Sequence, residues 1–114
     1  MPKFDKAPEA LVARFEVVAA RHPEAARRKM FGYPALFVGG NLATCLFADG
    51  WALRLSEADC ADALAVPGVT GFSPMPGRTM RGWALLPPEM VTDDATLEPW
   101  VQRALDFAAS LPSK

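Results

Sequence analysis

The stretch NLATCLFADGWALRL, residues 41–55, decides the fold class of this chain. Asp49-Gly50 near its middle is the strongest hairpin signal in the sequence, because a type I′ turn needs positive φ at both central positions. The residues on either side of this pair alternate in hydrophobicity, as strand residues do. We therefore predict two antiparallel strands, over residues 42–48 and 51–55, joined by a tight turn at Asp49-Gly50.

The alternation also predicts which side chains share a face of each strand. The first strand is mildly apolar on both faces, which is typical of a central strand. We expect one face to carry Leu42, Thr44 and Leu46, and the other to carry Ala43, Cys45 and Phe47. In the second strand an apolar face is formed by Trp51, Leu53 and Leu55. Ala52 and Arg54 lie opposite that face, so we expect this part of the sheet to be wet.

Further strands are predicted on both sides of the hairpin. Residues 27–31 and 35–38 form a pair joined by a turn at Gly32-Tyr33-Pro34, and residues 80–86 form a fifth strand. Residues 68–79 are rich in Gly and Pro and show little periodicity. A connection of this length is uncommon inside a small domain, so we expect it to be functional or packed by its own side chains.

Three helices complete the pattern. Apolar residues recur every three or four positions over residues 8–20 and 96–111. Ser56 and Asp59 form a capping box that starts a short helix, which ends before Pro67. The element order is α-β-β-β-β-α-β-α. We predict an α+β fold, a two-layer α/β sandwich whose antiparallel sheet of about five strands carries the helices on one face, with helices at both ends and one inserted.

Length and composition indicate one domain over residues 1–114, with a hydrophobic fraction of 51% that is enough to fill a single core. The net charge of −1 argues against a protein whose whole surface binds nucleic acid. No segment resembles a signal peptide or a membrane span. We expect a cytoplasmic protein that makes no membrane contact. Cys45 and Cys60 are expected to be reduced, although their spacing also permits a disulfide.

The residues that usually perform catalysis or bind metals form no recognisable set. His22, the only histidine, precedes a proline at a predicted helix end, where a capping role is commoner than a catalytic one. Neither cysteine has a neighbouring base, and the spacing of Cys45, Cys60 and His22 matches no zinc site. The glycine pairs lie between strands and not before a helix, so they form no phosphate cradle. We predict no enzyme activity, no cofactor and no metal.

Basic residues form the one notable concentration of charge. They are Arg21, Arg27, Arg28, Lys29, Arg54, Arg78 and Arg81. Such residues commonly protect a solvated strand edge against pairing with other strands. The alternative is a contact surface for an anion or a nucleic acid, which requires the side chains to converge in space. Both interpretations remain open on the sequence.

Several segments resemble one known family. They are Lys29-Met30-Phe31-Gly32-Tyr33, Leu36-Phe37-Val38 with Gly40 and Asn41, Leu53-Arg54-Leu55, Phe72 with Pro76-Gly77-Arg78 and Met80, Leu86-Pro87-Pro88-Glu89, and the closing run from Trp100 to Lys114. From Arg28 onward the chain resembles the N-terminal domain of the TfoX/Sxy competence regulators. The Met-Phe-Gly start joined to the Gly-Arg-x-Met segment is more specific than either piece alone.

The resemblance implies a secretion-chaperone-like α/β sandwich in a cytoplasmic bacterial protein linked to competence and transcription regulation. Full-length members resemble two-domain proteins, so the resemblance also implies that their helical C-terminal domain is absent from a chain that ends at Lys114. The family has no accepted catalytic residues. Its recurrent positions fall on Lys29, Met30, Phe31, Gly32, Arg54, Gly77 and Arg78.

These positions also have a physical interpretation. Gly32 and Gly77 suit turns that other residues would strain. We assign a turn and packing role to Met30, Phe31, Gly32, Tyr33, Gly77 and Met80. Packing explains Lys29, Arg54 and Arg78 less well, so we predict that these three form a contact site. Salt bridges within the domain are the competing explanation.

Three hypotheses about function follow. The first is a non-enzymatic regulatory or interaction module that binds another protein and is able to form a homodimer. The alternative is a small-anion or small-molecule binding domain that uses the loop at residues 68–79 and the nearby arginines. Direct nucleic-acid binding by this domain alone is the least supported of the three, and it predicts weak affinity that falls with salt.

Overall fold

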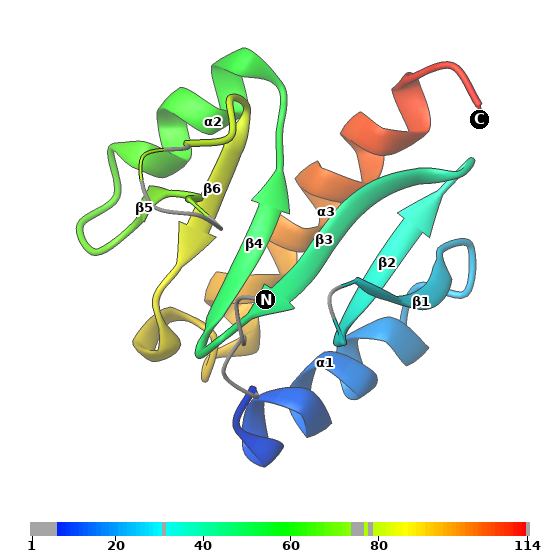
Figure 1. Cartoon of the computed structure of the whole chain (residues 1–114), viewed down its shortest axis with the longest axis horizontal. Helices are drawn as coiled ribbons and strands as arrows, with labels where there is room; N and C mark the ends of the chain where they lie inside the picture. Colours follow the sequence, from blue (N-terminus) through cyan, green and yellow to red (C-terminus); the bar gives the residue numbers. More distant parts are fainter. Residues whose placement is uncertain (1–6, 31, 74–76, 78, 114) are drawn as a thin grey trace.

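The computed structural model of the chain describes residues 7–30, 32–73, 77 and 79–113, and Figure 1 shows their arrangement. Helices and strands follow one another in the predicted order. The elements are α1 (Glu9–Ala20), β1 (Ala26–Met30), β2 (Tyr33–Val38), β3 (Asn41–Phe47), β4 (Gly50–Arg54), α2 (Glu57–Leu64), β5 (Thr70–Gly71), β6 (Trp83–Leu86), the 3-10 helix η1 (Pro88–Met90) and α3 (Asp94–Ser110).

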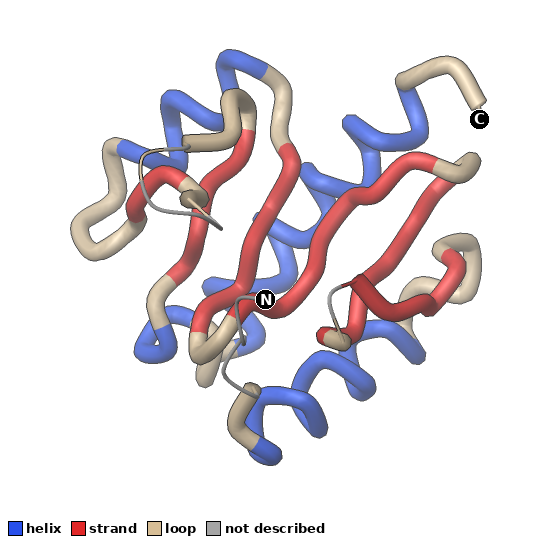
Figure 2. The backbone as a smooth tube through the Cα atoms, in the orientation of Figure 1, coloured by secondary structure: helices blue, strands red, loops and turns tan. Residues whose placement is uncertain are grey.

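The strands form one antiparallel sheet in the order β1-β2-β3-β4-β6-β5. In Figures 1 and 2, α3 crosses behind the strands and α1 lies at the bottom of the view. Both helices pack with the sheet in one hydrophobic core, so the helices form one layer and the sheet forms the other. The predicted α+β sandwich is confirmed. The sheet has one strand more than expected, because Thr70 and Gly71 pair with β6 inside the segment predicted to be a loop.

The hairpin between β3 and β4 is confirmed, but its turn differs from the prediction. Phe47 pairs with Gly50, so the two loop residues are Ala48 and Asp49. Among the described non-glycine residues only Ala48 has positive φ, at 51°. Gly50 is needed for a different reason, because a Cβ atom there would lie 2.8 Å from the side chain of Leu85 on the neighbouring strand β6.

A bulge in β3 changes the predicted faces of that strand. Leu36 of β2 pairs with Thr44, but the next residue of β2 pairs with Leu42, so Ala43 is the extra residue. Ala43 and Thr44 consequently both turn toward the helices. The prediction that Leu42, Thr44 and Leu46 share a face is therefore wrong, because strict alternation takes no account of a bulge.

The core between sheet and helices is centred on Trp51. Its side chain is fully buried, and its ring lies 4.9 Å from the ring of Phe15 on α1. The indole N–H donates to Thr44 Oγ1 at 2.8 Å, and that hydroxyl donates to the carbonyl of Ala52 at 2.6 Å. Thr44 lies on the same face as Leu46, so a polar side chain stands in the core, where its hydroxyl both accepts and donates a hydrogen bond.

The helix starts follow local capping chemistry. Ser56 Oγ accepts from the backbone N–H of Asp59 at 3.2 Å, as predicted for the start of α2. Asp93 caps α3 by accepting from the backbone N–H of Ala95. The helix therefore begins at Asp94 and not near residue 96, which places Pro99 in the second turn. No helix in the described ranges is both long and apolar enough to cross a membrane.

Candidate functional site

The strand β1 lies at one edge of the sheet and carries the consecutive cations. Its residues 26–29 are exposed and Met30 is half-buried; we call residues 26–30 the β1 edge. The Arg27 side chain is already paired, since its Nε donates to Glu16 on α1 at 2.7 Å. The Arg28 guanidinium lies 5.6 Å from the centre of the Phe37 ring. Lys29 makes no side-chain hydrogen bond or ion pair with any residue in the described part of the chain.

The three residues of the predicted contact site do not form one small site. Arg54 ends β4, and the sheet order places β2 and β3 between it and Lys29. At about 4.8 Å per strand, the two strands are about 14 Å apart. A small ligand at one of these residues does not reach the other, whereas a protein partner spans that distance. Arg78 lies outside the described residues, as does Phe31.

At the opposite edge of the sheet the surface is hollowed. A cavity of about 540 Å³, which we call the α2 cavity, lies between α2 and the segment that leads into β6. Its lining residues are Leu55, Glu57, Cys60, Ala61, Leu64, Gly71, Thr79, Met80, Arg81, Gly82, Trp83 and Phe107. The four from α2 are spaced at i, i+3, i+4 and i+7, so one face of that helix forms one wall. Leu64 is 46% exposed and Met80 40% exposed.

Charged groups surround the α2 cavity unevenly. Arg81 and Glu57 both line it, and neither makes an ion pair or side-chain hydrogen bond within the described residues. The guanidinium of Arg54 lies 6.0 Å from the centre of the Phe107 ring, and Phe107 is part of the lining. The predicted contact residue Arg54 and the predicted packing residue Met80 therefore belong to the same corner of the molecule.

The residues with a predicted turn and packing role differ in burial and in backbone conformation, and Tyr33 begins β2 and pairs with Met30 instead of lying in the turn. Tyr33 is buried and Met30 packs in part against the sheet cluster that contains Ala35. Gly32 and Gly77 have φ values of 83° and 78°, which residues with a Cβ atom rarely adopt. Met80 differs, because its exposure at the cavity makes it a surface residue more than a core one.

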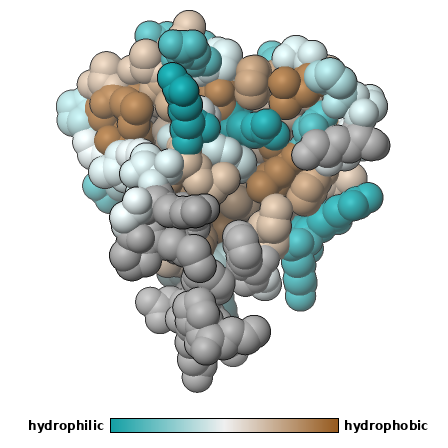
Figure 3. All heavy atoms as spheres, turned by 45° about the horizontal axis from the view of Figure 1, so that its top comes forward, coloured by the Kyte–Doolittle hydropathy of each residue, from teal (hydrophilic) through white to brown (hydrophobic). Residues whose placement is uncertain are grey.

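The sheet face turned away from α1 and α3 is not the wet surface predicted from Ala52. Ala52 is fully buried, together with Ala35 and Cys45 of the neighbouring strands. Phe72 and Trp83 pack over them, with ring centres 5.6 Å apart. Figure 3 shows hydrophobic residues that reach the surface at separate places between hydrophilic ones, and not as one continuous apolar patch.

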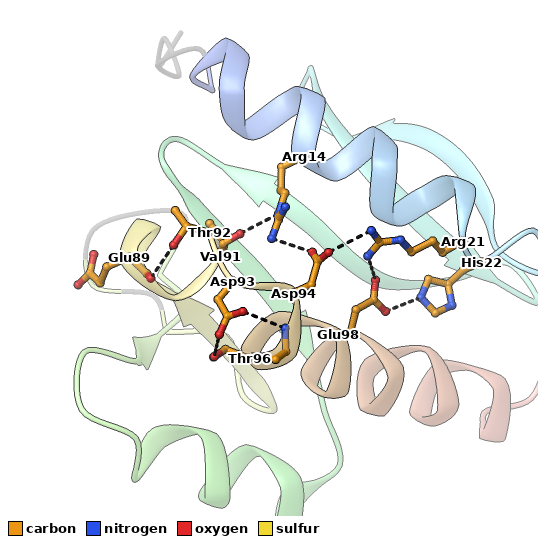
Figure 4. A network of polar contacts seen from close by, with 11 residues as sticks. Arg14, Arg21, His22, Glu89, Val91, Thr92, Asp93, Asp94, Thr96 and Glu98 are labelled. Atoms are coloured by element: carbon orange, nitrogen blue, oxygen red, sulfur yellow. Dashed lines mark hydrogen bonds and ion pairs between the residues drawn. The ribbon is translucent and has the colours of Figure 1, made fainter.

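A network of charges joins α1 to α3 (Figure 4). Asp94 forms an ion pair with Arg14 at 2.7 Å and accepts a hydrogen bond from Arg21 at 3.0 Å, and Arg21 also donates to Glu98 at 3.0 Å. His22 Nε2 lies 3.1 Å from Glu98 Oε2. The hydrogen bond from Arg21, together with the positive charge of Arg14, holds the pKa of Asp94 below its ordinary value, although partial burial opposes the shift. The side chain of His22 is thus part of the link between α1 and α3, and its contacts in the described residues are with the carboxylates of Glu98 and Glu24.

A second cavity of about 390 Å³, the α1 cavity, is lined by residues of α1 and η1 and by Val91 and Asp49. The Arg14 side chain reaches it, but Arg14 Nε donates to the carbonyl of Val91 at 3.0 Å and its terminal nitrogen binds Asp94. Arg14, the cation that lines this cavity, is therefore already paired within the domain.

Both cysteines are free and buried. Burial raises the pKa of Cys45 to about 12, and it raises the pKa of the Cys60 thiol as well. Cys60 Sγ lies 3.7 Å from the carbonyl of Trp83, as a weak donor. Neither thiol has the lowered pKa of a nucleophile. Within the described ranges no group of three or more His, Cys, Asp or Glu side chains is placed to hold a metal ion.

A comparison with known protein families matches residues 17–108 to the TfoX N-terminal domain. The matched range contains the whole sheet, all of α2 and nearly all of α3. No curated protein and no solved structure matches the chain. The resemblance indicated by the sequence motifs is confirmed, and the chain belongs to the TfoX N-terminal domain family.

Proposed function

We propose that this domain is a non-enzymatic interaction module that binds another protein through the β1 edge. The observation that carries the proposal is an exposed edge strand whose cations are not all used inside the domain. In the described part of the chain no other strand pairs with β1 on the side away from β2. Lys29 has no partner there, and Arg28 is held only over an aromatic ring.

An acidic extended segment fits this edge best. An added strand forms main-chain hydrogen bonds with a free edge, and its alternate side chains point to the two faces of the sheet. The side chain of Arg27 points to the sheet face that α1 covers, where it reaches Glu16. Because side chains alternate along a strand, Lys29 points to the same face and Arg28 to the opposite one. Carboxylates at alternate positions of the partner would then all lie on the face of Arg27 and Lys29, with an attraction that salt weakens.

The same charges disfavour a homodimer that pairs β1 with β1. In that arrangement Arg27, Arg28 and Lys29 would face the same three residues of a second copy. Like charges directly opposite each other destabilise a strand pair. A homodimer of this domain would therefore use another surface, and the partner at the β1 edge is a different protein.

Family membership supports a regulatory role for the module, and we extend the proposal to the control of competence or transcription in the bacterial cytoplasm. Two free, buried thiols favour a reducing compartment. The basic edge supports a direct contact with an acidic protein segment more than with DNA, because the cations lie along one short strand of a chain with net charge −1.

Binding of a labelled peptide that alternates glutamate with threonine tests the proposal by fluorescence anisotropy. We expect Lys29→Glu to weaken binding about tenfold, or about 1.4 kcal/mol, because an attraction becomes a repulsion. Arg81→Glu is the matched control, since it makes the same change of charge at the opposite edge and should leave the affinity unchanged. Melting temperatures of both variants should stay near that of the wild type.

Three outcomes would contradict the proposal. The first is equal loss of binding in both variants, and the second is equal binding of a peptide that alternates lysine with threonine. The third is tighter binding of a single-stranded oligonucleotide than of the acidic peptide, with an affinity that falls steeply as salt rises. That third result would assign the β1 edge to nucleic acid.

The α2 cavity supports a second candidate function, the binding of a small molecule beside the 68–79 segment. Its volume of about 540 Å³ lies in the range of ligand sites. Gly71 and Thr79, which flank the connection, line it together with Arg81. This function would be separate in space from partner binding at β1, so one chain could have both.

A further inference from the structure

We propose that the α2 cavity binds a molecule with an apolar body and one negatively charged end group, such as a medium-chain or aromatic carboxylate. The inference rests on the second candidate function, small-molecule binding, and not on capture of a protein at the β1 edge. It is carried by three observations: the apolar walls, the exposed side chains at the mouth, and two nearby arginines that make no ion pair among the described residues.

The side chains that line the walls of the α2 cavity favour a ligand with an apolar body. Cys60, Leu64 and Ala61 come from one face of α2, and Trp83 and Phe107 come from the sheet and from α3. The polar groups of these side chains are the indole N–H of Trp83 and the Cys60 thiol, which lies against the Trp83 carbonyl. The rest of their surface is apolar, so an apolar group that enters the cavity displaces water mainly from carbon atoms.

The mouth of the cavity leaves large hydrophobic side chains in water. Leu64 and Met80 are 46% and 40% exposed, and among the described residues they are two of the three most exposed large hydrophobic side chains. They come from different elements, yet both line the same cavity. A ligand that covers them removes apolar surface from water at two sides at once, which favours binding.

The charges select an anionic end group. Arg81 lines the cavity without an ion pair among the described residues, and Arg54 lies beside the lining residue Phe107. Glu57 is the carboxylate of the lining, so among the nearby charged groups that make no ion pair in the described residues there are two arginines and one carboxylate. The neighbouring acids of α2, Asp59 and Asp62, share the single positive charge of Arg103, at 3.4 and 3.5 Å.

The size of α2 favours a small molecule over a helix of another protein. The helix has eight residues, which corresponds to a length of about 12 Å. A partner helix in a groove usually places anchors over two turns or more and needs a longer wall. Arginine is also well suited to a carboxylate, because its planar fork donates two parallel hydrogen bonds to the two oxygens.

Titration of the full chain with decanoate, decanol and decylamine, each below its micelle-forming concentration, tests the inference. Binding is followed by amide chemical shifts in NMR and by the rate at which iodoacetamide alkylates Cys60. We expect decanoate to bind at least tenfold more tightly than decylamine, with decanol between them. We also expect bound decanoate to slow alkylation of Cys60, and Arg81→Gln to remove most of the preference for decanoate over decanol.

Two exposed alanines of α2 supply matched variants. Ala61 lines the cavity and Ala58 does not. Ala61→Trp should fill the space and abolish binding of decanoate, whereas Ala58→Trp should leave it unchanged. Equal changes in melting temperature in the two variants would show that folding does not cause the difference.

The outcomes separate the two levels of the proposal. Equal binding of all three probes would overturn the anionic end group but leave small-molecule binding in place. Absence of binding by every probe would overturn both the ligand class and the second candidate function. Binding of decanoate that survives Ala61→Trp would show that the site lies elsewhere. Peptide binding at the β1 edge is measured independently and does not depend on any of these results.

Discussion

The two edges of the sheet differ in the chemical character of their surfaces. The β1 edge is extended, exposed and basic, and its main chain is open to an added strand. At the other edge, β5 has only two residues, and α2 with the segment into β6 encloses an apolar cavity. The first surface suits a long polar partner and the second suits a compact apolar one.

The difference is the basis of the two kinds of recognition that we propose for this fold. A strand edge binds an extended segment mainly through backbone hydrogen bonds, so the segment can carry many different side chains. Charge is then the main property that distinguishes one segment from another. A cavity selects its ligand by shape, and a single charged group in its wall orients the ligand. The central strands β3 and β4 lie between the two regions and give both a common rigid support.

The largest effect is expected from a change in that support. Trp51→Ala should lower the free energy of unfolding by about 3–5 kcal/mol, because it opens a cavity in the core and removes the ring beneath Phe15. Both edges should lose binding in parallel as the domain unfolds. Urea denaturation measures the loss. A variant that unfolds as the wild type does would show that the two regions do not share this core.

A smaller effect is expected from the link between α1 and α3. Because the folded pKa of Asp94 is lowered, its ion pairs stabilise the fold fully above the ordinary carboxyl pKa near 3.8, and this contribution disappears as pH falls through the lowered value. Asp94→Asn should therefore lower the melting temperature at pH 7 by less than Trp51→Ala does. The gap between variant and wild type should close in acid.

The Asp94→Asn variant also serves as a control for binding at the two edges, because Asp94 lies at neither of them. At neutral pH and a temperature where the variant is folded, peptide and decanoate affinities should match the wild type. A gap in melting temperature that widens toward low pH would contradict the assigned role of Asp94.

The smallest perturbation is chemical labelling of the two thiols in the native chain. Cys60 lines the α2 cavity, whereas Cys45 lies beneath Phe72 and Trp83 on the sheet face, and burial raises its pKa to about 12. We expect iodoacetamide to modify Cys60 slowly and Cys45 more slowly still, as mass spectrometry of peptides would show. Faster modification of Cys45 would mean that Phe72 and Trp83 move away from the sheet face more readily than the α2 cavity admits the reagent to Cys60.

The sequence predicted the fold better than the site. Tight turns and alternating strands are local patterns, so the element order and the hairpin were predictable. The bulge at Ala43 and the two-residue strand β5 were not, because each depends on pairing with a neighbour. Gly50 was recognised as a turn residue, whereas its main constraint is the approach of Leu85.

The site depended on contacts between distant parts of the chain. Arg21 and Glu98 are 77 positions apart, and no pattern in the sequence relates them. Lys29 and Arg54 were grouped because packing explained neither, but the sheet order separates them. One wall of the α2 cavity was predicted only as a short helix that starts at the capping box of Ser56 and Asp59. The other wall joins the end of the aperiodic segment 68–79 to residues 80–83, which were predicted to be part of a strand.

One NMR experiment tests most directly the claim that the two edges bind different chemistries. The acidic glutamate–threonine peptide and decanoate are added to the same labelled sample, first separately and then together. We predict that the peptide shifts amides of β1 and β2, that decanoate shifts amides of α2, β6 and the end of α3, and that neither displaces the other. Shifts from both ligands on the same residues, or displacement of one by the other, would contradict the account.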